Sequence, residues 1–512
     1  MGAKSKFQEI RRDEKSRGSS DKFRKMSREQ ILEAVPAELK KQIAMTHPMA
    51  FAKRYVPRLM KKPSPPFHLE MVNTVLNNDR VLFLAPRDHA KSTLFSFIYP
   101  LYKIVSNRNI RISLVSDTQT QAYKFVKAVR FELENNDKLI EDFGEFEGEN
   151  WQKSQFTVQR DINYKDPTMA GYGLNSSKLG DRSDLIICDD PINKDVCLTS
   201  ARRKKASRWY FEVLTNFLEE EGGQMITIGT RQHEKDLYKE LMEKPTYVSK
   251  VYKAIDPRSE KVLWPDKWTY DRLMERKKEI GSLAFARQFQ NEITSEGSSV
   301  FPEKLLEPLL NREAEMVNPY GERPRWLKRY RLFMGVDLAS SAAVGADYVV
   351  LVTVAVDEDK NRKLLHVWRD KGVPFQEQID EIIRLDEFFD YERIVIESNQ
   401  YQSILPSTLK EKTDLPIMSY QTGVEKHTED VGVPSLRILF ENGKYEFPYG
   451  EECREEVDTL LEELNGMAWD EGKLITTAAH KDTVMALWLA EKGVDEANVG
   501  NRFEIVDRGE RY

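Results

Sequence analysis

Two separate groups of chemically active residues follow one another along this chain, and their order constrains its fold more than any single motif does. The first group lies before residue 240 and combines a lysine-containing loop with a pair of aspartates. The second begins near residue 337 and consists of three carboxylates that are far apart in the sequence. Each group alone is common, whereas the ordered pair is rare. The chain is therefore expected to fold as two large units with one site each.

Length and composition agree with this expectation. The 512 residues are 40% hydrophobic and 32% charged, and one hydrophobic core does not usually organise so long a chain. The longest mainly apolar run, residues 349–356, is far shorter than a membrane span, so a soluble, unsecreted protein without a membrane partner is expected. Cys188, Cys197 and Cys453 lack metal-type spacing, which predicts packing residues in a reducing compartment.

The net charge of −6 argues against a uniformly basic coat, so any contact with nucleic acid must use local positive surfaces. Residues 1–30 contain ten Lys or Arg and five Asp or Glu, which gives 10 − 5 = +5. Residues 1–45 are therefore predicted to be a basic, flexible segment. A solvated tail without a partner and a segment that contacts DNA or protein both stay open.

The run from Val81 to Thr93 has the strand, loop, helix order of a phosphate-binding loop. Aligned on Lys91, it has the spacing G-x-x-x-x-G-K-[ST] with alanine at both glycine positions. Lys91 is expected to reach the β and γ phosphates of ATP, and the Ser92 hydroxyl to ligate Mg²⁺. Arg87 adds a second cation, predicted to be catalytic like Lys91. The predicted nucleotide-binding residues of the loop are Ala85, Pro86, Arg87, Asp88, His89, Ala90, Lys91, Ser92 and Thr93.

A second apolar run predicts the magnesium side of the same site. Residues 185–188 favour a β-strand, and Asp189 and Asp190 follow them directly. Asp189 is expected to hold the Mg²⁺ shell, and Asp190 is predicted to be catalytic by orienting the attacking water. The alternative is a strand that ends in a polar Asp-Asp-Pro turn.

Two further segments favour a parallel sheet around this site. Residues 111–116 predict a strand that leads into a helix, and residues 224–230 predict a strand that ends at Thr230. Side chains at the carboxyl end of such a sheet reach a bound nucleotide, so Thr230 is predicted to bind ATP, and Arg231 is placed to sense its γ-phosphate. His68 is a candidate adenine contact, with a structural role as the alternative. Candidates for an arginine finger from a neighbouring subunit are Arg182, Arg202 and Arg203.

The sequence between the two groups predicts a small helical subdomain. Residues 263–292 have amphipathic helical spacing with an N-cap near Thr269, and a polar linker follows them. The predicted units after the N-terminal segment are a P-loop ATPase domain at 46–245, a helical lid or linker subdomain at 246–325, a nuclease domain at 326–495 and a tail at 496–512.

The three carboxylates of the second half follow the order of an RNase H-like domain. Asp337 lies late on the first of three consecutive strands, Glu397 ends a fourth, and Asp482 lies in the first turn of a helix. Paired divalent cations need anionic oxygen ligands and stabilise both the attacking and the leaving oxygen of a phosphodiester. Asp337, Glu397 and Asp482 are therefore predicted to bind metal and to be catalytic, with Asp347 as a fourth metal ligand. Taken singly, each could be a strand end or a helix cap.

The whole arrangement resembles the large terminase subunit of tailed bacteriophages, over roughly residues 50–493. In the ATPase half the motifs are the loop variant with Arg87, LIICDDP at 185–191 and ITIGTRQHEKDL at 226–237. The connecting motifs are LWPDKW at 263–268 and GSLAFARQFQNE at 281–292. The nuclease motifs are GVDLA at 335–339, IVIES at 394–398, LFENGKYEFP at 439–448 and AAHKDTVMALWLA at 478–490.

The resemblance implies an α/β protein with a RecA-like P-loop ATPase domain built on a parallel sheet, a small helical linker subdomain and a C-terminal RNase H-like nuclease domain. It implies a viral motor that uses ATP to move double-stranded DNA into a procapsid and cleaves concatemeric DNA with Mg²⁺ or Mn²⁺. The implied partners are double-stranded DNA, the portal protein and a small terminase subunit. It further implies a homo-oligomeric ring on the portal, with a monomer as the alternative state in solution, and action in the host cytoplasm rather than in the mature virion.

The chain departs from the family pattern at several positions. Alanines replace the loop glycines at Ala85 and Ala90, Asp190 stands where a Glu is usual, and Lys481 stands where an acid is frequent. Two rival functions stay open. A host helicase-nuclease of repair or recombination would need a second RecA-like domain after residue 237. A non-catalytic adaptor would keep the RNase H-like fold without its chemistry.

Overall fold

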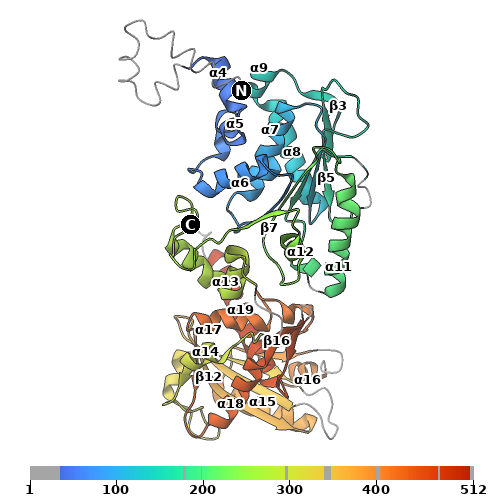
Figure 1. The fold of residues 1–512 in the computed structure, drawn as a ribbon. Coiled ribbons are helices and arrows are strands. Elements are labelled where there is room, and N and C mark those ends of the chain that lie inside the picture. The colour runs from blue at the N-terminus through green and yellow to red at the C-terminus, as the bar shows by residue number, and fades with distance from the viewer. Residues whose placement is uncertain are drawn as a thin grey trace, which may run out of the picture.

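The computed structural model describes residues 35–176, 180, 182–197, 199–293, 298–338, 348–398, 404–470 and 473–507. These residues form two α/β domains joined by a small helical unit (Figure 1). The predicted ligand Asp347 and most of the basic N-terminal segment lie outside the described residues. Helix α4 (Ala37–Ala44) lies within the segment predicted to be flexible, so that prediction is wrong at its C-terminal end.

The N-terminal domain is built on a sheet in the order β3-β4-β5-β2-β6-β7-β1-β8. The six strands from β5 to β8 in this order run parallel, and the antiparallel pairings are those of β4 with β3 and β5 at one edge, which confirms the predicted parallel sheet. The strands are β1 (Arg80–Leu84), β2 (Ile112–Ser116), β3 (Glu147–Trp151), β4 (Gln155–Val158), β5 (Met169–Gly173), β6 (Leu185–Asp189), β7 (Gln224–Gly229) and β8 (Val248–Val251).

Alternate residues of the central strands supply two separate hydrophobic cores, because successive side chains of a strand point to opposite faces. In β6, Ile187 belongs to one core, whereas Ile186 and Cys188 belong to the other. Helices on the first face are α5 (Pro48–Tyr55), α6 (Pro66–Leu76), η2 (Thr93–Ile98), α7 (Tyr99–Ser106), α8 (Gln119–Asn135) and α9 (Asp137–Phe143). Helices on the second face are α10 (Lys194–Cys197), α11 (Ser200–Arg208), η3 (Trp209–Val213), η4 (Leu214–Phe217) and α12 (Leu237–Glu243).

A small helical unit, residues 252–293, follows the sheet and is called the lid below. Its main element is α13 (Tyr270–Gln290), capped by Thr269 as predicted and kinked at Gly281, where φ is 79°. The lid has its own core of Ala254, Ile255, Leu273, Phe285 and Phe289. Because β8 pairs with β1, the ATPase sheet extends to Val251 and passes the boundary predicted at 245.

The C-terminal domain contains a sheet in the order β14-β13-β10-β11-β12-β15-β9. The expected antiparallel meander is present as β10, β11 and β12, and β13 lies parallel to β10 on its other side. The strands are β9 (Leu310–Asn311), β10 (Arg331–Asp337), β11 (Tyr348–Val356), β12 (Arg362–Lys371), β13 (Arg393–Glu397), β14 (Ile417–Tyr420) and β15 (Tyr445–Pro448). A separate hairpin is formed by β16 (Met467–Asp470) and β17 (Lys473–Thr476).

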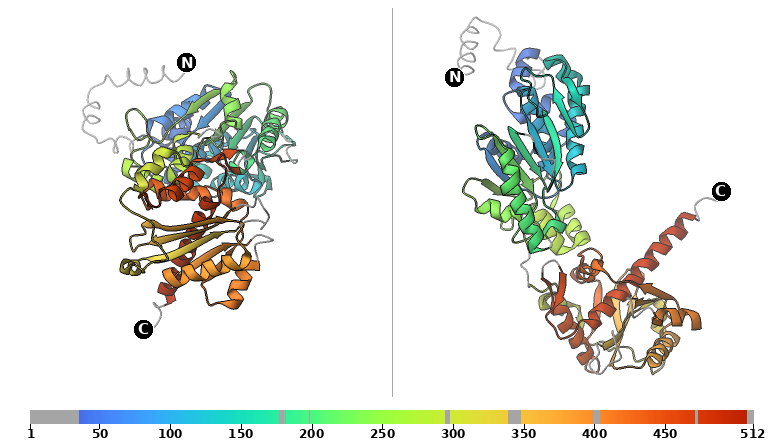
Figure 2. Two further views of the ribbon diagram at one scale, coloured as in Figure 1. Left: turned by 90° about the horizontal axis from the view of Figure 1, so that it is seen from below. Right: turned by 90° about the vertical axis from the view of Figure 1, so that its right-hand side faces the viewer.

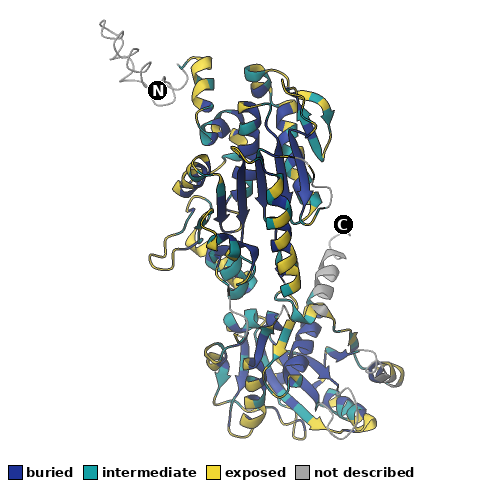
Figure 3. Ribbon diagram, turned by 45° about the vertical axis from the view of Figure 1, so that its right-hand side comes forward, coloured by how far each residue is buried: buried dark blue, intermediate teal, exposed yellow. Residues whose placement is uncertain are grey.

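Helices cover both faces of this second sheet, whose strands are largely buried (Figure 3). One face packs against α14 (Glu303–Leu306), η5 (Glu307–Leu309), α17 (Leu436–Glu441), α18 (Arg454–Asn465) and α19 (Asp482–Asp507). The other packs against α15 (Phe375–Phe389) and α16 (Ile404–Lys412). The remaining short turns are η1 (Pro57–Leu59), η6 (Arg325–Arg329), η7 (Val424–His427) and η8 (Val433–Ser435).

The N-terminal and C-terminal limits of the nuclease domain differ from the predicted 326–495. Val300, Phe301, Leu306 and Leu309 are buried in its core, and β9 extends its sheet, so residues from about 298 belong to it rather than to a linker. At the other end α19 continues to Asp507, into the predicted tail. These segments are short or polar and carry little periodicity, so their membership depends on tertiary packing.

The lid joins the two domains (Figure 2). Ser282 in α13 donates its backbone N–H to Glu441 of α17 at 2.7 Å, and Arg287 donates two hydrogen bonds to Glu429 at 2.7 and 2.8 Å. Among the described helices, none combines the length and the apolar composition of a bilayer span.

We expect Gly335→Ala to destabilise the nuclease domain. A Cβ at this position of β10 would lie 1.9 Å from the carbonyl oxygen of Ala486 and 2.4 Å from the nitrogen of Ala490, both in α19. Forcing the helix off the sheet should lower the free energy of unfolding by about 3 kcal/mol. Denaturant unfolding measures this loss. Gly423→Ala is the matched control, because its Cβ would meet no atom within 4 Å; an equal loss in both variants would contradict the packing argument.

Candidate functional site

The predicted nucleotide residues meet at the carboxyl ends of three neighbouring strands, β6, β7 and β1. The loop after β1 carries Lys91, whose Nζ donates to the hydroxyl of Thr230, just after β7, at 3.0 Å. The same Nζ lies 3.4 Å from Oδ2 of Asp190, just after β6. The Ser92 hydroxyl donates to Oδ1 of Asp189 at 2.9 Å. Parallel strands place their carboxyl ends at one edge, which is where such folds bind ligands.

Asp189 is a buried acid at this edge, and its pKa is raised. Burial and the neighbouring Asp190 carboxylate raise its pKa to about 6, against the lowering effects of hydrogen bonds with Ser96 and Ser92 and of the Lys91 charge. A buried carboxylate beside a serine hydroxyl fits the Mg²⁺ shell of a phosphate-binding loop.

The φ angles of the loop show whether each of the two alanines strains the backbone. Ala90 has φ 62° and Asp88 has φ 61°, in the left-handed region that glycine adopts without strain. Alanine at position 90 therefore carries a strain of about 1 kcal/mol. Ala85 has no positive φ; it is buried and donates its N–H to the carbonyl of Gly229 at 3.2 Å. Only the second departure from the glycine pattern strains the loop.

The remaining loop residues lie around this bend. Pro86 is buried and its carbonyl accepts from the N–H of His89 at 3.3 Å, and Thr93 begins η2. Arg87 donates from Nη1 to Oε1 of Gln288 in the lid at 3.0 Å. The guanidinium of Arg87 thus contacts the lid in this structure, and its predicted catalytic role stays a prediction.

Arg231, His68 and Arg203, three other candidates for nucleotide contacts, each have partners within the protein. Arg231 donates to the fully buried carboxylate of Asp236 at 3.1 Å and to two nearby carbonyls, so its guanidinium is engaged in a structural ion pair. His68 is buried and donates from Nε2 to the carbonyl of His89 at 3.0 Å, which favours its structural alternative. Arg203 is buried and donates to the carbonyl of Cys197 at 2.7 Å. Arg182 and Arg202 are exposed, so they remain the candidates for a finger.

The three carboxylates of the second half are brought together by β10, β13 and α19. Val336 pairs with Ile396 in parallel register, so Asp337 and Glu397, each the next residue, end adjacent strands at the same edge. Asp482 is the first residue of α19, and Val484, Leu487 and Trp488 of this helix are fully buried, as expected. The helix packs on β10 and β13 and thereby brings Asp482 to the two strand ends.

Asp337 is buried, and its carboxyl group shares a hydrogen bond with Glu397. Burial and the charge of Glu397 raise the pKa of Asp337 well above its usual value, with Asp482 adding to the effect and Lys481 opposing it. Two buried carboxyl groups in contact hold a proton between them until a cation replaces it. The donor set therefore fits a divalent cation.

Several hydrogen bonds that orient the carboxylate cluster were not predicted from the sequence. Thr422 donates its hydroxyl to Glu397. Glu463 of α18 accepts from the N–H groups of Thr483 at 2.8 Å and Val484 at 3.2 Å, and so caps the helix that begins at Asp482. Arg369 lies 3.3 Å from the same Glu463 carboxylate. The acid at 463 looks like any other in α18, so no local signal identifies it.

Within the described residues, no group of three or more His, Cys, Asp and Glu side chains is already arranged as metal ligands. The contacts explain this: Glu397 bonds to Thr422 and to Asp337. A cation would therefore have to displace the hydrogen bond between the two carboxyl groups.

Comparison with known proteins identifies the domain that contains this second site. Residues 334–491 match the family described as the terminase RNase H-like domain. The C-terminal domain belongs to this family. The match confirms the RNase H-like fold and the resemblance to terminases that the C-terminal motifs indicated. No curated protein sequence matches the chain.

Solved structures of phage large terminases match the chain over different shares of its length. The large terminase of a thermophilic bacteriophage, in complex with ATP-γ-S, has 9% identity and a TM-score of 0.46, covering 83% of this chain and 98% of that one. The large terminase of bacteriophage HK97 has 15% identity and a TM-score of 0.37, covering 88% and 99%. The large terminase nuclease of thermophilic phage G20c, with bound magnesium, has 20% identity and a TM-score of 0.30, covering 38% and 97%.

We expect the metal affinity of the terminase RNase H-like domain to rise with pH. Because the pKa of Asp337 is raised, a proton must leave as a cation binds. Below that raised pKa, the Kd for Mn²⁺ should fall by up to about tenfold per pH unit. Titration calorimetry from pH 6 to pH 8 measures the trend. Asp337→Asn should flatten it, and a pH-independent Kd in the unmodified protein would contradict the shared proton.

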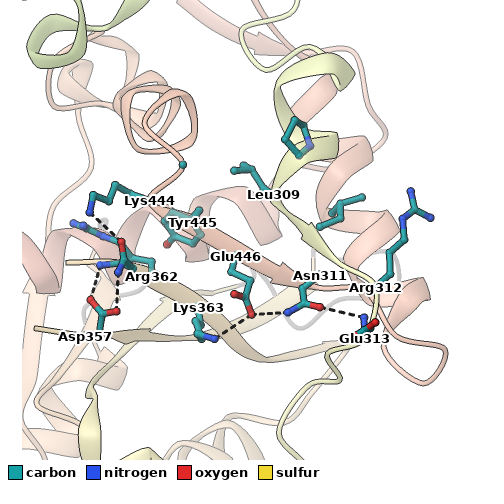
Figure 4. A pocket seen from close by; sticks show the side chains of 14 residues that line it. Leu309, Asn311, Arg312, Glu313, Asp357, Arg362, Lys363, Lys444, Tyr445 and Glu446 are labelled. Carbon is teal, nitrogen blue, oxygen red and sulfur yellow. Dashed lines mark hydrogen bonds and ion pairs between the residues drawn. The ribbon is translucent and has the colours of Figure 1, made fainter. Parts of the chain in front are cut away.

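A polar hollow of about 610 Å³ lies elsewhere on the terminase RNase H-like domain, between β9, β12 and β15 (Figure 4). None of the predicted site residues lines it. Two of its charged side chains have close partners: Lys363 lies 3.2 Å from Glu446, and Asp357 accepts from Asn361 at 2.7 and 2.8 Å. The hollow is separate from the carboxylate cluster.

Proposed function

We propose that this chain is a viral genome-packaging motor, which hydrolyses ATP to translocate double-stranded DNA into a procapsid and cleaves concatemeric DNA by two-metal endonuclease chemistry. The observation that carries the proposal is the coexistence, on one chain, of a terminase RNase H-like domain and a phosphate-binding loop whose Lys91 meets Thr230 and Asp190. A motor and a nuclease on one chain are the combination that packaging needs.

In the ATPase half, backbone N–H groups of the loop and the Lys91 ammonium bind the β and γ phosphates. Ser92 and Asp189, already in contact, would hold the magnesium ion. That ion neutralises charge on the phosphates when bound. Asp190 lies 3.4 Å from Lys91 and orients the attacking water, and Thr230 keeps the lysine directed at the phosphates. The nucleotide loop as a whole, including Arg87, carries the predicted binding role.

In the nuclease half, Asp337, Glu397 and Asp482 would hold one or two divalent cations. Mg²⁺ or Mn²⁺ supplies a polarised phosphodiester and an activated water. The protein's own contribution is orientation. Thr422 donates to Glu397, and Glu463 caps the first turn of α19, so these contacts orient Glu397 and the helix start that carries Asp482. Asp347 is proposed as a fourth ligand.

The proposed partners follow from this function. Double-stranded DNA is the substrate of both halves, and the portal protein and a small terminase subunit are the proposed assembly partners. The chain is proposed to act in the host cytoplasm as a homo-oligomeric ring docked on the portal. Arg182 and Arg202 are exposed and thus available to an adjacent subunit.

The two rival functions are less well supported. A helicase-nuclease needs a second RecA-like domain, yet the described residues after β8 form the lid and then join the nuclease sheet. A non-catalytic adaptor has no need for buried, mutually destabilising carboxylates, yet Asp337 and Glu397 are in contact.

A triplex-displacement assay tests the proposal. The full chain is incubated with linear duplex DNA that carries a bound third strand, with and without ATP and Mg²⁺. A packaging motor should displace the third strand only with ATP and leave the duplex strands paired, and in Mn²⁺ it should also cut plasmid DNA. Separated duplex strands would favour the helicase, and the absence of both ATP hydrolysis and cleavage would favour the adaptor.

A further inference from the structure

The lid contacts the phosphate-binding loop at three consecutive residues. Arg87 donates its backbone N–H to the carbonyl of Gln288 at 2.9 Å, in addition to the side-chain bond between the same two residues. Lys267 donates from Nζ to the carbonyl of Asp88. The rings of His89 and Trp268 form a parallel, displaced stack, with ring planes 7° apart and centroids 6.4 Å apart. We call Lys267, Trp268 and Gln288 the lid clamp.

The clamped segment is the strained part of the loop. His89 lies between Asp88 and Ala90, the two residues with left-handed backbones. It is fully buried, its Nδ1 bonds to the carbonyl of Arg87 at 2.7 Å, and burial lowers its pKa to about 4, so the ring is neutral at physiological pH. Non-glycine residues stay in such conformations only where surrounding contacts hold them. Here those contacts come from the lid and from α6, where His68 donates to the carbonyl of His89 at 3.0 Å.

Two ring nitrogens in the stack of His89 and Trp268 have unsatisfied hydrogen-bonding capacity. Nε2 of His89 and Nε1 of Trp268 are both buried and have no hydrogen-bond partner. Buried polar groups normally find partners, so this packing is kept for a reason other than its own stability. The C-cap of α13 also contacts the loop after β7, which contains Thr230, because Asn291 accepts from the N–H of Arg231 at 3.1 Å. The lid therefore contacts both the loop of Lys91 and the loop of Thr230.

We propose that the lid clamp holds the phosphate-binding loop in its nucleotide-binding conformation, and that Trp268 and His89 are positioning residues for ATP hydrolysis. The inference rests on the proposed ATPase function and deepens it. The clamp compensates for the missing glycine. A glycine would adopt φ 62° without strain, whereas Ala90 is held at this angle through the stack of its neighbour His89 on Trp268. By linkage, whatever displaces the lid weakens nucleotide binding, and bound nucleotide holds the lid in place.

The test measures kcat and KM for ATP in the full chain with Trp268→Ala and Trp268→Phe. Removing the stack should raise KM about tenfold and lower kcat, while phenylalanine, which can still stack on His89, should stay within about twofold of the unmodified protein. Metal-dependent plasmid cleavage should be unchanged in both variants. Trp268→Ala with an unchanged KM would overturn the proposal.

A matched control separates positioning from lid stability. Phe285 lies in the lid core and stacks on Phe289 at 5.1 Å, and it belongs to no contact of the clamp. Phe285→Leu should lower the melting temperature without the rise in KM. If it raises KM as much as Trp268→Ala does, the clamp is merely part of a stable lid and the proposal fails.

A rescue addresses the backbone argument directly. Glycine at position 90 adopts the required φ without help, so Ala90→Gly should restore at least half of the kcat/KM lost in Trp268→Ala, a larger gain than it gives in the unmodified protein. An equal factor in both backgrounds would overturn the link between clamp and strain. An unmodified chain that hydrolyses no ATP would instead refute the proposed function, so the two failures are distinguishable.

Discussion

Replacing Lys91 with alanine is expected to abolish ATP hydrolysis and leave metal-dependent DNA cleavage intact. The ammonium group of Lys91 is buried at the meeting point of β1, β6 and β7, and it is the cation that contacts both Thr230 and Asp190. Removing a fixed charge from a site that stabilises developing negative charge should lower kcat at least about 100-fold. Phosphate release measures the first activity, and conversion of supercoiled plasmid in Mn²⁺ measures the second.

The control for this variant is an exposed lysine of the same domain. Lys239 on α12 pairs with Glu243 at the surface, so Lys239→Ala should leave both activities near their original values. Loss of cleavage in Lys91→Ala would contradict the separation of the two sites, since Lys91 and the carboxylate cluster belong to different sheets. ATP hydrolysis that persists in Lys91→Ala would mean that the phosphate site lies elsewhere.

The strands and the residues at their ends were predictable because their signals are local. A buried parallel strand needs an apolar run, and Leu185–Asp189 provides one that ends in the acid itself. The same holds for β10 ending at Asp337 and β13 ending at Glu397. Register then follows from topology, because adjacent parallel strands align their carboxyl ends. Two sites whose members are up to 482 − 337 = 145 residues apart thus follow from short runs.

The contacts of the lid were not predictable, because they depend on tertiary packing. Nothing in the run 263–268 indicates that Lys267 and Trp268 meet Asp88 and His89. Arg87 has a loop position suggestive of catalysis, yet its partner here is Gln288. The domain limits failed for a similar reason: β8 and β9 are short strands whose assignment depends on the neighbours they pair with.

Departures from the glycine pattern illustrate how one position can differ from another that looks identical in the sequence. Ala85 and Ala90 are the same substitution, but only Ala90 has a left-handed backbone. A pattern reports which residue stands at a position and not the φ angle it must adopt. The strain at Ala90 becomes visible only with the structure, and so does the lid clamp that offsets it.

Replacing Asp337 with alanine is expected to abolish DNA cleavage and to stabilise the metal-free protein. Cleavage should fall at least about 100-fold, because the cation loses a ligand supplied by the sheet. The stability effect follows from the raised pKa of Asp337. Its protonated carboxyl group stabilises the folded state below the unfolded pKa of 3.8, and this stabilisation is lost as the pH rises through the raised pKa of the folded state. Above that raised pKa, the variant should therefore melt at a higher temperature than the unmodified protein without metal.

Addition of Mn²⁺ should reverse that order, and this reversal distinguishes a metal ligand from a residue that merely packs. The unmodified protein should gain melting temperature with Mn²⁺ because the cation neutralises Asp337 and Glu397, and Asp337→Ala should gain little. Asp357→Ala is the matched control, because Asp357 is also an aspartate at a strand end of this sheet. It follows Val356, which pairs with Arg331, so it lies at the end of β10 opposite to Asp337. It should keep both cleavage and the shift with Mn²⁺. Cleavage that survives Asp337→Ala, or an equal Mn²⁺ shift in that variant, would show that the cation binds elsewhere.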